Sequence, residues 1–304
     1  MDLLLHFRAF VRVAELGGFS AAARALNTSQ PAVSRQVADL EARLGARLLH
    51  RSSTGVSLTE EGRAFLDAAR QALDSADGAL GAVGARRGEV AGEVRLGAPL
   101  AFGRLHIVPR LPALLERHLG LSLDLVLGDA FGDLVQDGLD ATIRIGVVTD
   151  PGLIVRRIGL TRRVTVASPA YLAKAGAPRH PDDLAKHDCL RFAGLSTGDT
   201  WVFERAGEVA RVPVTGRFRA SASDAVRTAV LAGMGIFVAP VWLFGPEIAS
   251  GEVVTLLEDW APPAVPIQVA TSSRRQVPPR VRAVTDHLAA EFRLDPLLTD
   301  YGMG

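Results

Sequence analysis

The chain has 304 residues, of which 48% are hydrophobic and 22% charged, a composition typical of a folded protein with more than one domain and inconsistent with wholesale disorder. The formal net charge of +1 excludes a basic field over the whole molecule, so a nucleic-acid partner would have to meet a local patch. The single cysteine, Cys189, excludes an internal disulfide framework and a zinc site built from cysteines.

The first part of the chain predicts two short helices. Gly17 and Gly18 end the first one, because glycine permits the left-handed turn that closes a helix. Ser20 is the expected N-cap of the second helix, with Phe19 as its hydrophobic staple. The first helix is predicted from apolar residues at helical spacing: Phe7, Phe10, Val11 and Ala14.

A third helix is expected from Pro31, which is tolerated in a first helical turn, to Gly45. One face of it is apolar and the other is small and polar. A helix of this kind can approach base edges in a DNA major groove, so that only its few longer polar side chains reach them. The apolar face carries Val33, Val37, Leu40 and Leu44, and the polar face carries Pro31, Ser34, Arg35, Ala38 and Ala42.

The charge of this region supports a DNA-reading unit. Gln30, Ser34 and Arg35 can donate hydrogen bonds to bases or phosphates. The alternative is a plain three-helix bundle with a solvated arginine face. The arginines outnumber the two acidic residues, Asp39 and Glu41, between positions 24 and 51: Arg24, Arg35, Arg43, Arg47 and Arg51.

The segment 48–59 predicts two short strands around a turn that contains Gly55, which is a β-hairpin wing. Arg51 is suited to a phosphate contact at the base of this wing. Thr59 is the expected cap of the following helix. A wing directly after a recognition-type helix is difficult to explain as a packing accident.

These residues resemble the DNA-binding signature of the LysR-type transcriptional regulators. The resemblance runs from Phe19 to Gly62 and continues more loosely into the second half, for example at 168–172 and 233–236. Thr54 and Leu49 depart from it, since many members carry a basic residue and a phenylalanine there. The resemblance implies a DNA-contact surface formed by Ser29, Gln30, Pro31, Ser34, Arg35, Arg51, Ser53 and Thr54.

A long helix is expected over 60–88, with an apolar seam at alternating steps of three and four, as in a coiled coil. We expect a second copy of the chain to cover this seam, which would give a homodimer that reads a pseudo-palindrome. The alternative is a helix packed only on its own domain, and the resemblance adds a dimer of dimers. The seam consists of Leu66, Ala69, Leu73, Ala76, Leu80 and Val83.

Beyond Gly92 strands alternate with helices, which predicts a mainly parallel α/β sheet and then a second lobe from about Val164. A helix is expected over 105–117, a short one over 133–136 and a last one over 279–292. Two lobes that the chain connects twice, once on leaving the first lobe and once on returning to it, are expected to form a ligand cleft between them, at strand ends and helix starts. The candidate ligand contacts are Leu100, Ala101, Phe102, Gly128, Arg144, Gly146, Ser196 and Ser223.

Two of these candidates also have structural interpretations. Ser223 is equally suited to be the N-cap of the helix that starts at Asp224, and Arg144 to pair with Asp140 or Asp133. The absence of a serine or threonine at Ala101, where related sequences often have one, leaves the charge of the ligand open.

The predicted fold is therefore a mainly α winged helix-turn-helix domain with a long linker helix, followed by a bilobal α/β effector domain like that of periplasmic binding proteins, with two Rossmann-like lobes. The expected domains are 1–59 (helix-turn-helix about 19–38), 60–88 and 92–294, with lobe 1 at about 92–163 and 267–294 and lobe 2 at about 164–266. We predict a LysR-type transcriptional regulator that binds double-stranded promoter DNA as a dimer or tetramer and responds to a small-molecule effector, with no cofactor and no metal.

Rival functions explain less of the chain. A solute-binding protein would account for the second half only and would carry a signal peptide, whereas residues 1–6 lack that pattern and the apolar runs are too short to span a membrane, so we expect a cytoplasmic protein. The segment 194–198 matches the Gly-x-Ser-x-Gly elbow of serine hydrolases, with Asp224 and His287 as formal partners of Ser196, but a strand-like pattern follows it where a helix is required. We therefore do not expect an enzyme.

Overall fold

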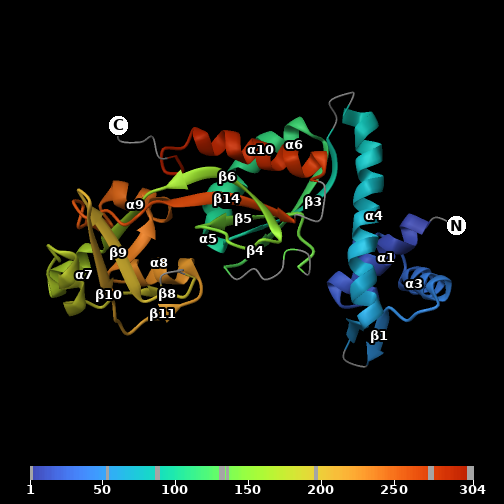
Figure 1. Cartoon of the computed structure of the whole chain (residues 1–304), viewed down its shortest axis with the longest axis horizontal. Coiled ribbons are helices and arrows are strands. Elements are labelled where there is room, and N and C mark those ends of the chain that lie inside the picture. Colours follow the sequence, from blue (N-terminus) through green and yellow to red (C-terminus); the bar gives the residue numbers. More distant parts are fainter. Residues whose placement is uncertain are drawn as a thin grey trace.

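In the computed structural model the chain forms a helical N-terminal domain, a long helix and an elongated α/β part with two lobes (Figure 1). The structure describes residues 3–52, 55–85, 90–129, 134, 137–194, 198–272 and 277–299. The long helix α4 stands beside the first lobe, and the second lobe lies at the far end of the molecule (Figure 1).

The N-terminal domain is built on a small core that α1, α3 and α4 share. Gly17 and Gly45 adopt positive φ angles of 65° and 64°, which end α1 and α3 as predicted. The core contains Phe10, Val13, Val33, Val37, Leu40 and Leu48. The elements are α1 (Leu3–Leu16), α2 (Phe19–Ala25), α3 (Gln30–Leu44), β1 (Leu49–Ser52), β2 (Gly55–Leu58) and α4 (Glu60–Ala85).

The predicted N-cap of the second helix and its predicted hydrophobic staple are both wrong. The helix α2 starts at Phe19 with Gly18 as its N-cap, so Ser20 is not the cap, and its hydroxyl donates to Gln30 Oε1 at 3.3 Å instead. Phe19 is therefore the first helical residue rather than a staple before the cap. Leu44 is 43% exposed because it lies in the last turn of α3, beyond the reach of the core.

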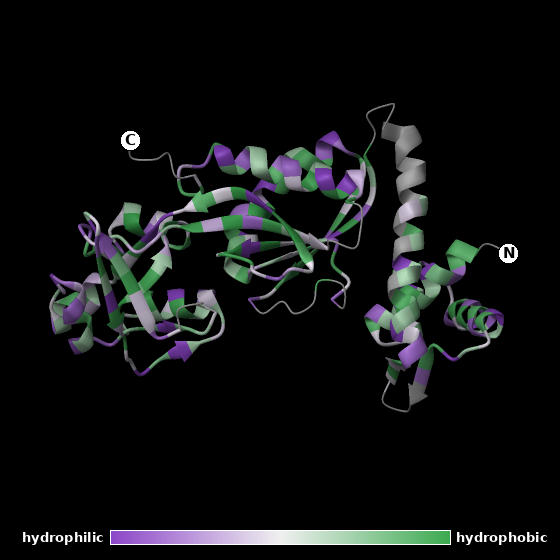
Figure 2. Ribbon diagram, viewed as in Figure 1, coloured by the Kyte–Doolittle hydropathy of each residue, from purple (hydrophilic) through white to green (hydrophobic). Residues whose placement is uncertain are grey.

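The first lobe is a sheet of five strands in the order β4-β3-β5-β14-β6. The helix α10 packs on β3 and β6, and hydrophobic and hydrophilic residues alternate along it, as on α3 (Figure 2). The strands are β3 (Ala91–Ala98), β4 (Gly120–Leu127), β5 (Ala141–Ile145), β6 (Leu153–Thr161) and β14 (Val265–Ser272), and α10 is Pro279–Arg293.

The sheet of the first lobe is mixed, which corrects the mainly parallel sheet that we predicted. β3 runs parallel to β4 and β5, whereas β14 runs antiparallel to β5 and β6. The chain leaves this lobe after β6 and returns through β14. Since one strand leads away from the lobe and its neighbour leads back into it, the two are antiparallel.

The helical segment after β3 begins at Leu100 rather than at Leu105 and changes its hydrogen-bond pattern three times. It consists of α5 (Leu100–Phe102), a π-helical turn η1 (Gly103–Ile107), a 3₁₀ turn η2 (Val108–Arg110) and α6 (Leu111–Arg117). Pro109 and Pro112 lack the N–H groups that a continuous α-helix needs, which explains the irregular middle. The helix predicted over 133–136 lies outside the described residues, apart from Leu134.

The second lobe contains the sheet β12-β7-β13, in which β7 is antiparallel to both neighbours, the hairpin β9-β10 and the parallel pair β11-β8. One continuous core runs through both lobes and includes Phe102, Phe203, Phe237, Phe244 and Phe292. The strands are β7 (Arg163–Ala167), β8 (Arg191–Phe192), β9 (Thr200–Arg205), β10 (Glu208–Pro213), β11 (Arg219–Ala220), β12 (Phe237–Pro240) and β13 (Val254–Leu256). The helical elements are α7 (Pro169–Ala175), η3 (Pro181–Lys186), α8 (Ser223–Leu231), η4 (Val241–Leu243) and α9 (Gly245–Ser250).

Candidate nucleic-acid interface and ligand cleft

The helix α3 presents its predicted polar face at the surface. The Ser29 hydroxyl accepts a hydrogen bond from the backbone N–H of Ala32 at 3.4 Å and so caps the helix, and Pro31 lies in the first turn. Gln30, Pro31 and Arg35 are exposed, and Ser34 is half-buried. Because Val33, Val37 and Leu40 anchor the opposite face in the core, α3 is held with this polar face outward.

This region is more positive at its surface than the residue count suggests. Glu41 is buried, and its carboxylate accepts hydrogen bonds from the N–H groups of Leu48 and Leu49 at 2.8 and 3.2 Å. Its negative charge therefore lies inside the domain, where it also pairs with Arg47 at 3.9 Å. The arginines at 24, 35, 43 and 47 are all exposed.

The predicted wing is the antiparallel hairpin β1-β2, in which Leu49 pairs with Leu58 and Ser52 with Gly55. It is fixed to the helices at two points. The N–H of Val56 donates to the Gly17 carbonyl at 3.2 Å, and the Thr59 hydroxyl accepts the Gly62 N–H at 2.8 Å, so Thr59 caps α4 as predicted. The side chain of Arg51, and residues Ser53 and Thr54, lie outside what the structure describes.

The first turns of α4 pack on the chain's own domain, which corrects part of the predicted dimer seam. Leu66 is 7% exposed and Ala69 is 0% exposed, both within the N-terminal core. The α1 helix covers them because Phe65 of α4 meets Phe7 and Phe10 in edge and tilted ring contacts. These two residues are therefore not available to a second copy. Leu73 and Ala76 are half-buried, and the side chains of Leu80 and Val83 are outside the described part.

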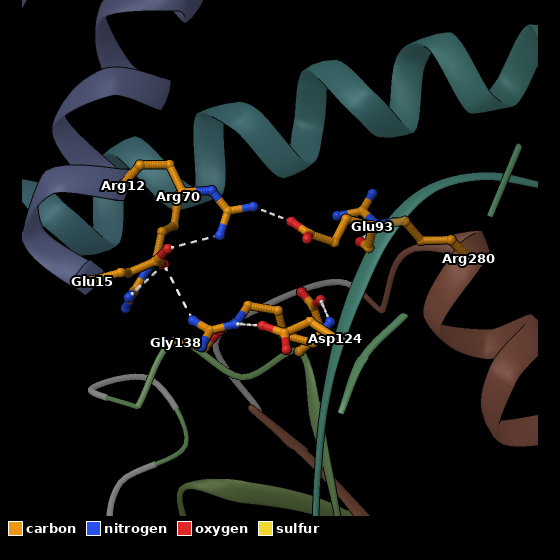
Figure 3. Close-up of polar contacts among 9 residues, drawn as sticks. Arg12, Glu15, Arg70, Glu93, Asp124, Gly138 and Arg280 are labelled. Carbon is orange, nitrogen blue, oxygen red and sulfur yellow. Dashed lines mark hydrogen bonds and ion pairs between the residues drawn. The ribbon is translucent and has the colours of Figure 1, made fainter. Parts of the chain in front are cut away.

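A charged cluster joins the N-terminal domain to the first lobe (Figure 3). We call it the Glu15 cluster. It consists of Arg12 and Glu15 from α1, Arg70 from α4, Glu93 and Arg95 from β3, Asp124 from β4, and Gly138.

Glu15 is the shared acceptor of the cluster. One of its oxygens lies 2.9 Å from Arg70 and 3.8 Å from Arg95, and the other lies 3.3 Å from Arg12. Arg12 also pairs with Glu93, and Arg95 pairs with Asp124 at 2.8 Å (Figure 3). The side chains of Glu15 and Arg70 are only 10% and 8% exposed, so their charges interact in a poorly solvated environment.

Between the lobes lies a cavity of about 270 Å³, which we call the interlobe cavity. Its walls combine two arginines and one aspartate with aromatic and aliphatic side chains from both lobes. The lining residues are Pro99, Asp129, Arg144, Ile145, Gly146, Val147, Arg163, Phe192, Gly194, Ser223, Phe237, Val238, Pro240, Trp242, Leu243 and Val265.

Three of the predicted ligand contacts line this cavity: Arg144, Gly146 and Ser223. Ala101 and Phe102 are 0% exposed in the core, so they are not available to a ligand, since the helix turns them inward as soon as it starts. Leu100 and Gly128 are not among the lining residues, and Ser196 lies outside the described residues.

Asp129 and Arg163 are the cavity residues that the sequence reasoning missed. Asp129 accepts the backbone N–H of Leu100 at 3.1 Å and that of Ser223 at 2.8 Å, together with the Ser223 hydroxyl at 3.4 Å. Its carboxylate thus occupies the backbone N–H of Leu100, which we had predicted as a ligand contact. The N-cap of α8 is Ala222, so the N-cap interpretation of Ser223 is wrong.

Both arginines of the cavity are half-buried. Burial lowers the pKa of the Arg144 and Arg163 guanidinium groups from their ordinary value, because desolvation disfavours the charged form. Arg144 Nε donates to the Thr142 hydroxyl at 3.2 Å, and Arg163 Nε donates to the Pro263 carbonyl at 2.8 Å. The neighbouring acids Asp137 and Asp150 partly offset the shift in the Arg144 pKa.

The rival chemistries find no assembled site in the part of the chain that the structure describes. The strand β9 follows Gly198, whereas a nucleophile elbow requires a helix there, as the sequence pattern had indicated. His287 is half-buried and its Nε2 donates to the Arg110 carbonyl at 2.7 Å, while Asp224 pairs with Arg104. No group of three or more metal-ligating side chains occurs there, and none of its helices is long and apolar enough to pass through a bilayer.

Comparison with known proteins agrees with this layout. Residues 4–63 match the family described as "Bacterial regulatory helix-turn-helix protein, lysR family", and residues 87–293 match the "LysR substrate binding domain". The chain is 38% identical over 293 residues to the HTH-type transcriptional regulator PtxR of Pseudomonas aeruginosa, covering 96% of this chain and 94% of that protein.

Solved structures of full length give the same result. CrgA of Neisseria meningitidis, a LysR-type transcriptional regulator, is similar with a TM-score of 0.61 and 31% identity, over 94% of this chain and 98% of that one. The Vibrio cholerae virulence activator AphB is similar with a TM-score of 0.60 and 26% identity, over 95% of this chain and 99% of that one.

Proposed function

Because the chain belongs to the LysR family of transcriptional regulators, we propose that the exposed face of α3 reads promoter DNA and that the interlobe cavity binds the effector. The chain is a DNA-binding transcriptional regulator with an effector-binding domain, and not an enzyme. One observation carries the DNA part of the proposal: the apolar side of α3 is buried while its polar side is exposed.

On the proposed DNA surface, Gln30, Ser34 and Arg35 reach base edges or phosphates from the first turns of α3. Ala38 and Ala42, which are exposed on the same face, are small enough to let the helix approach the groove floor. Ser29 and Pro31 set the start of the helix against the phosphate backbone. The wing contributes Arg51, Ser53 and Thr54.

We propose that two copies pair through the part of α4 beyond its own domain, namely Leu73, Ala76, Leu80 and Val83. A single helix-turn-helix reads few base pairs, so a symmetric pair is needed to recognise a pseudo-palindrome. The proposed domains are 1–59, 60–88 and 92–294, and the protein would act in the cytoplasm, where the chromosome is. Effector binding between the lobes would then alter the spacing of the DNA-binding pairs.

The test of the DNA surface is a gel-shift titration with the DNA upstream of the protein's own gene. Arg35→Ala should weaken binding about tenfold or more at near-physiological salt, since a base contact is worth roughly 1 to 3 kcal/mol. Arg117→Ala removes the same charge from an exposed position in α6 and serves as the control. Equal affinities of the two variants would contradict the role of Arg35.

The salt dependence of the same titration separates two roles of Arg35. A phosphate contact lowers the slope of log affinity against log salt by about one when it is lost, whereas a base contact leaves the slope and relaxes sequence preference.

A further inference from the structure

Arg163 holds an unusual position at the hinge between the lobes. It opens β7 directly after the crossing from β6, which ends at Thr161. Its Nε donates to the carbonyl of Pro263, which precedes β14 on the return crossing, at 2.8 Å. A single guanidinium therefore touches both chain crossings and also lines the interlobe cavity.

The charge of Arg163 has no counter-ion within the described part of the chain. No described carboxylate lies within 4 Å of its guanidinium, and neither of its Nη atoms donates to a described residue. Burial lowers the pKa of this group, and no neighbouring acid offsets the shift. A half-buried cation without an anion is costly, so an anion entering the cavity would recover part of that cost.

The one acidic residue that lines the cavity does not neutralise Arg163. The Asp129 carboxylate already receives three donors, the N–H of Leu100 and the N–H and hydroxyl of Ser223. Arg144 is a second cation among the lining residues, and it comes from β5 of the first lobe. The lining thus carries two guanidinium groups and one carboxylate that is already hydrogen-bonded, and this excess of positive charge favours an anion in the cavity.

The rest of the cavity is apolar. Phe192, Phe237 and Trp242 supply aromatic walls, and Val238 and Leu243 supply aliphatic ones. A volume of about 270 Å³ admits a compact molecule. A fully hydrated inorganic ion would leave these walls in contact with water, whereas a ring or short branched chain would fill them.

We infer that the interlobe cavity takes a small organic anion, a carboxylate carried on an aromatic or compact apolar body, and that Arg163 binds its anionic group. This inference deepens the proposed effector function and rests on it. Because Arg163 also bonds to Pro263, the anion would be held at the point where the two lobes meet.

The experiment compares three probes that share one ring and differ in charge: benzoate, benzamide and benzylamine. Each is titrated into the full-length protein by calorimetry. Benzoate should bind at least tenfold more tightly than benzamide, because a charge-assisted contact is about twice as strong as a neutral one, and benzylamine should bind least. A wild-type protein that binds none of the three, or does not prefer benzoate, overturns the inference.

Variants of Arg163 assign the effect to this residue. Arg163→Gln should abolish the preference for benzoate over benzamide, and Arg163→Lys should retain part of it, since lysine keeps the charge but not the fork of donors. Arg162→Gln removes the same charge from the exposed neighbouring residue and should leave the preference unchanged. A preference that survives in Arg163→Gln, or disappears equally in Arg162→Gln, overturns the inference.

Operator binding without any probe distinguishes the two proposals. If the protein and its variants shift their DNA and benzoate is not preferred, the anion inference fails and the proposed DNA function stands. If no DNA is shifted while benzoate is preferred, the proposed DNA surface fails. Equal melting temperatures of Arg163→Gln and the wild type exclude a folding defect as the cause of the lost preference.

Discussion

Arginine residues play opposite parts in two regions of this protein. In the Glu15 cluster, Arg12, Arg70 and Arg95 each lie within 4 Å of a Glu15 oxygen, and Arg12 and Arg70 donate hydrogen bonds to it. In the interlobe cavity, the only hydrogen bond of the Arg163 guanidinium to a described residue goes to the Pro263 carbonyl. All four residues are arginines, and each side chain is at least partly buried.

The difference shows that an arginine paired with a carboxylate stabilises the arrangement of two domains, whereas an arginine without a carboxylate can bind a ligand. A poorly solvated ion pair gains little over an apolar contact, but it is expensive to break, so the Glu15 cluster holds the N-terminal domain in one arrangement on the first lobe. An unmatched cation costs stability, and it is retained where a ligand can complete it.

The largest expected effect is the loss of the shared acceptor. Glu15→Gln keeps the shape of the side chain but removes the charge that three arginines share, so we expect the free energy of unfolding to fall by about 3 kcal/mol. Glu116→Gln, at an exposed position of α6, should change it by less than about 0.5 kcal/mol. The measurement is urea unfolding of the full chain, and equal midpoints for the two variants would contradict the role of Glu15.

A second, smaller effect is expected at Gly138. A Cβ at this position would lie 2.7 Å from Arg70 Nη2, 2.8 Å from Arg95 Nη1 and 3.1 Å from Glu15 Oε1, so Gly138→Ala has to displace the cluster. The matched control is Gly251→Ala, because Gly251 also has a positive φ (79° against 68°), adopts the left-handed conformation and has nothing within 4 Å of its Cβ position.

Both alanine variants carry the strain of a left-handed backbone, roughly 1 to 2 kcal/mol. Gly138→Ala should cost about 1 to 3 kcal/mol more, which is the range for overpacking. Thermal unfolding of the two proteins side by side measures this excess. If the two glycines prove equally replaceable, the cluster is not sensitive to its spacing.

Replacing the arginines themselves compares the two regions directly. Arg163→Met keeps the packing of the alkyl chain, loses one hydrogen bond and removes a desolvated charge, so the stability should change by less than about 1 kcal/mol. Arg70→Met takes the donor at 2.9 Å away from Glu15 and should cost more. Similar losses in both variants would mean that Arg163 is as well matched as Arg70.

The smallest effect concerns His106, a buried base of η1 whose ring contacts the Trp242 ring. Burial is the main cause that lowers the pKa of His106, and Arg110 adds to it, although the Trp242 carbonyl and Asp295 oppose the shift. The folded state therefore binds this proton more weakly than the unfolded chain does. Its contribution to stability is present above the unfolded pKa of about 6.5 and is lost as the pH falls below it.

The melting temperature should accordingly fall further between pH 7.5 and pH 5.5 for the wild type than for His106→Gln. Unlike an arginine, this base can lose its proton when it is buried, even though Asp295 lies 3.7 Å from its Nδ1. Identical pH profiles for the two proteins would show that the His106 proton is not linked to folding.

Local features of the fold were predictable from the sequence. Ser29, Pro31 and Gly45 define the ends of α3, and Thr59 caps α4, because capping and positive φ depend on residues within a few positions of one another. The polar face of α3 follows from helical periodicity alone. Where two neighbouring signals competed, as at Gly18 and Ser20, the predicted N-cap was two residues away from the observed one.

The choice of partner was decided by the tertiary structure. The periodicity of α4 shows that Leu66 and Ala69 need a cover, but it does not say whether α1 or a second chain provides it. Whether neighbouring strands of the first lobe are parallel or antiparallel likewise depends on where the chain re-enters the sheet. It leaves the sheet after β6 at Thr161 and returns 104 positions later, at Val265, where β14 starts.

The charged groups show the same division. That Arg70, Arg95 and Arg163 carry positive charge is evident from the sequence, as is the net charge of the chain. Which of them finds a carboxylate depends on contacts such as the one between Arg70 and Glu15, 55 positions apart. A helix end depends on its near neighbours, whereas the environment of a buried charge depends on whatever the folded chain brings beside it, and for that reason only the structure distinguishes a charge that stabilises the fold from one that is open to a ligand.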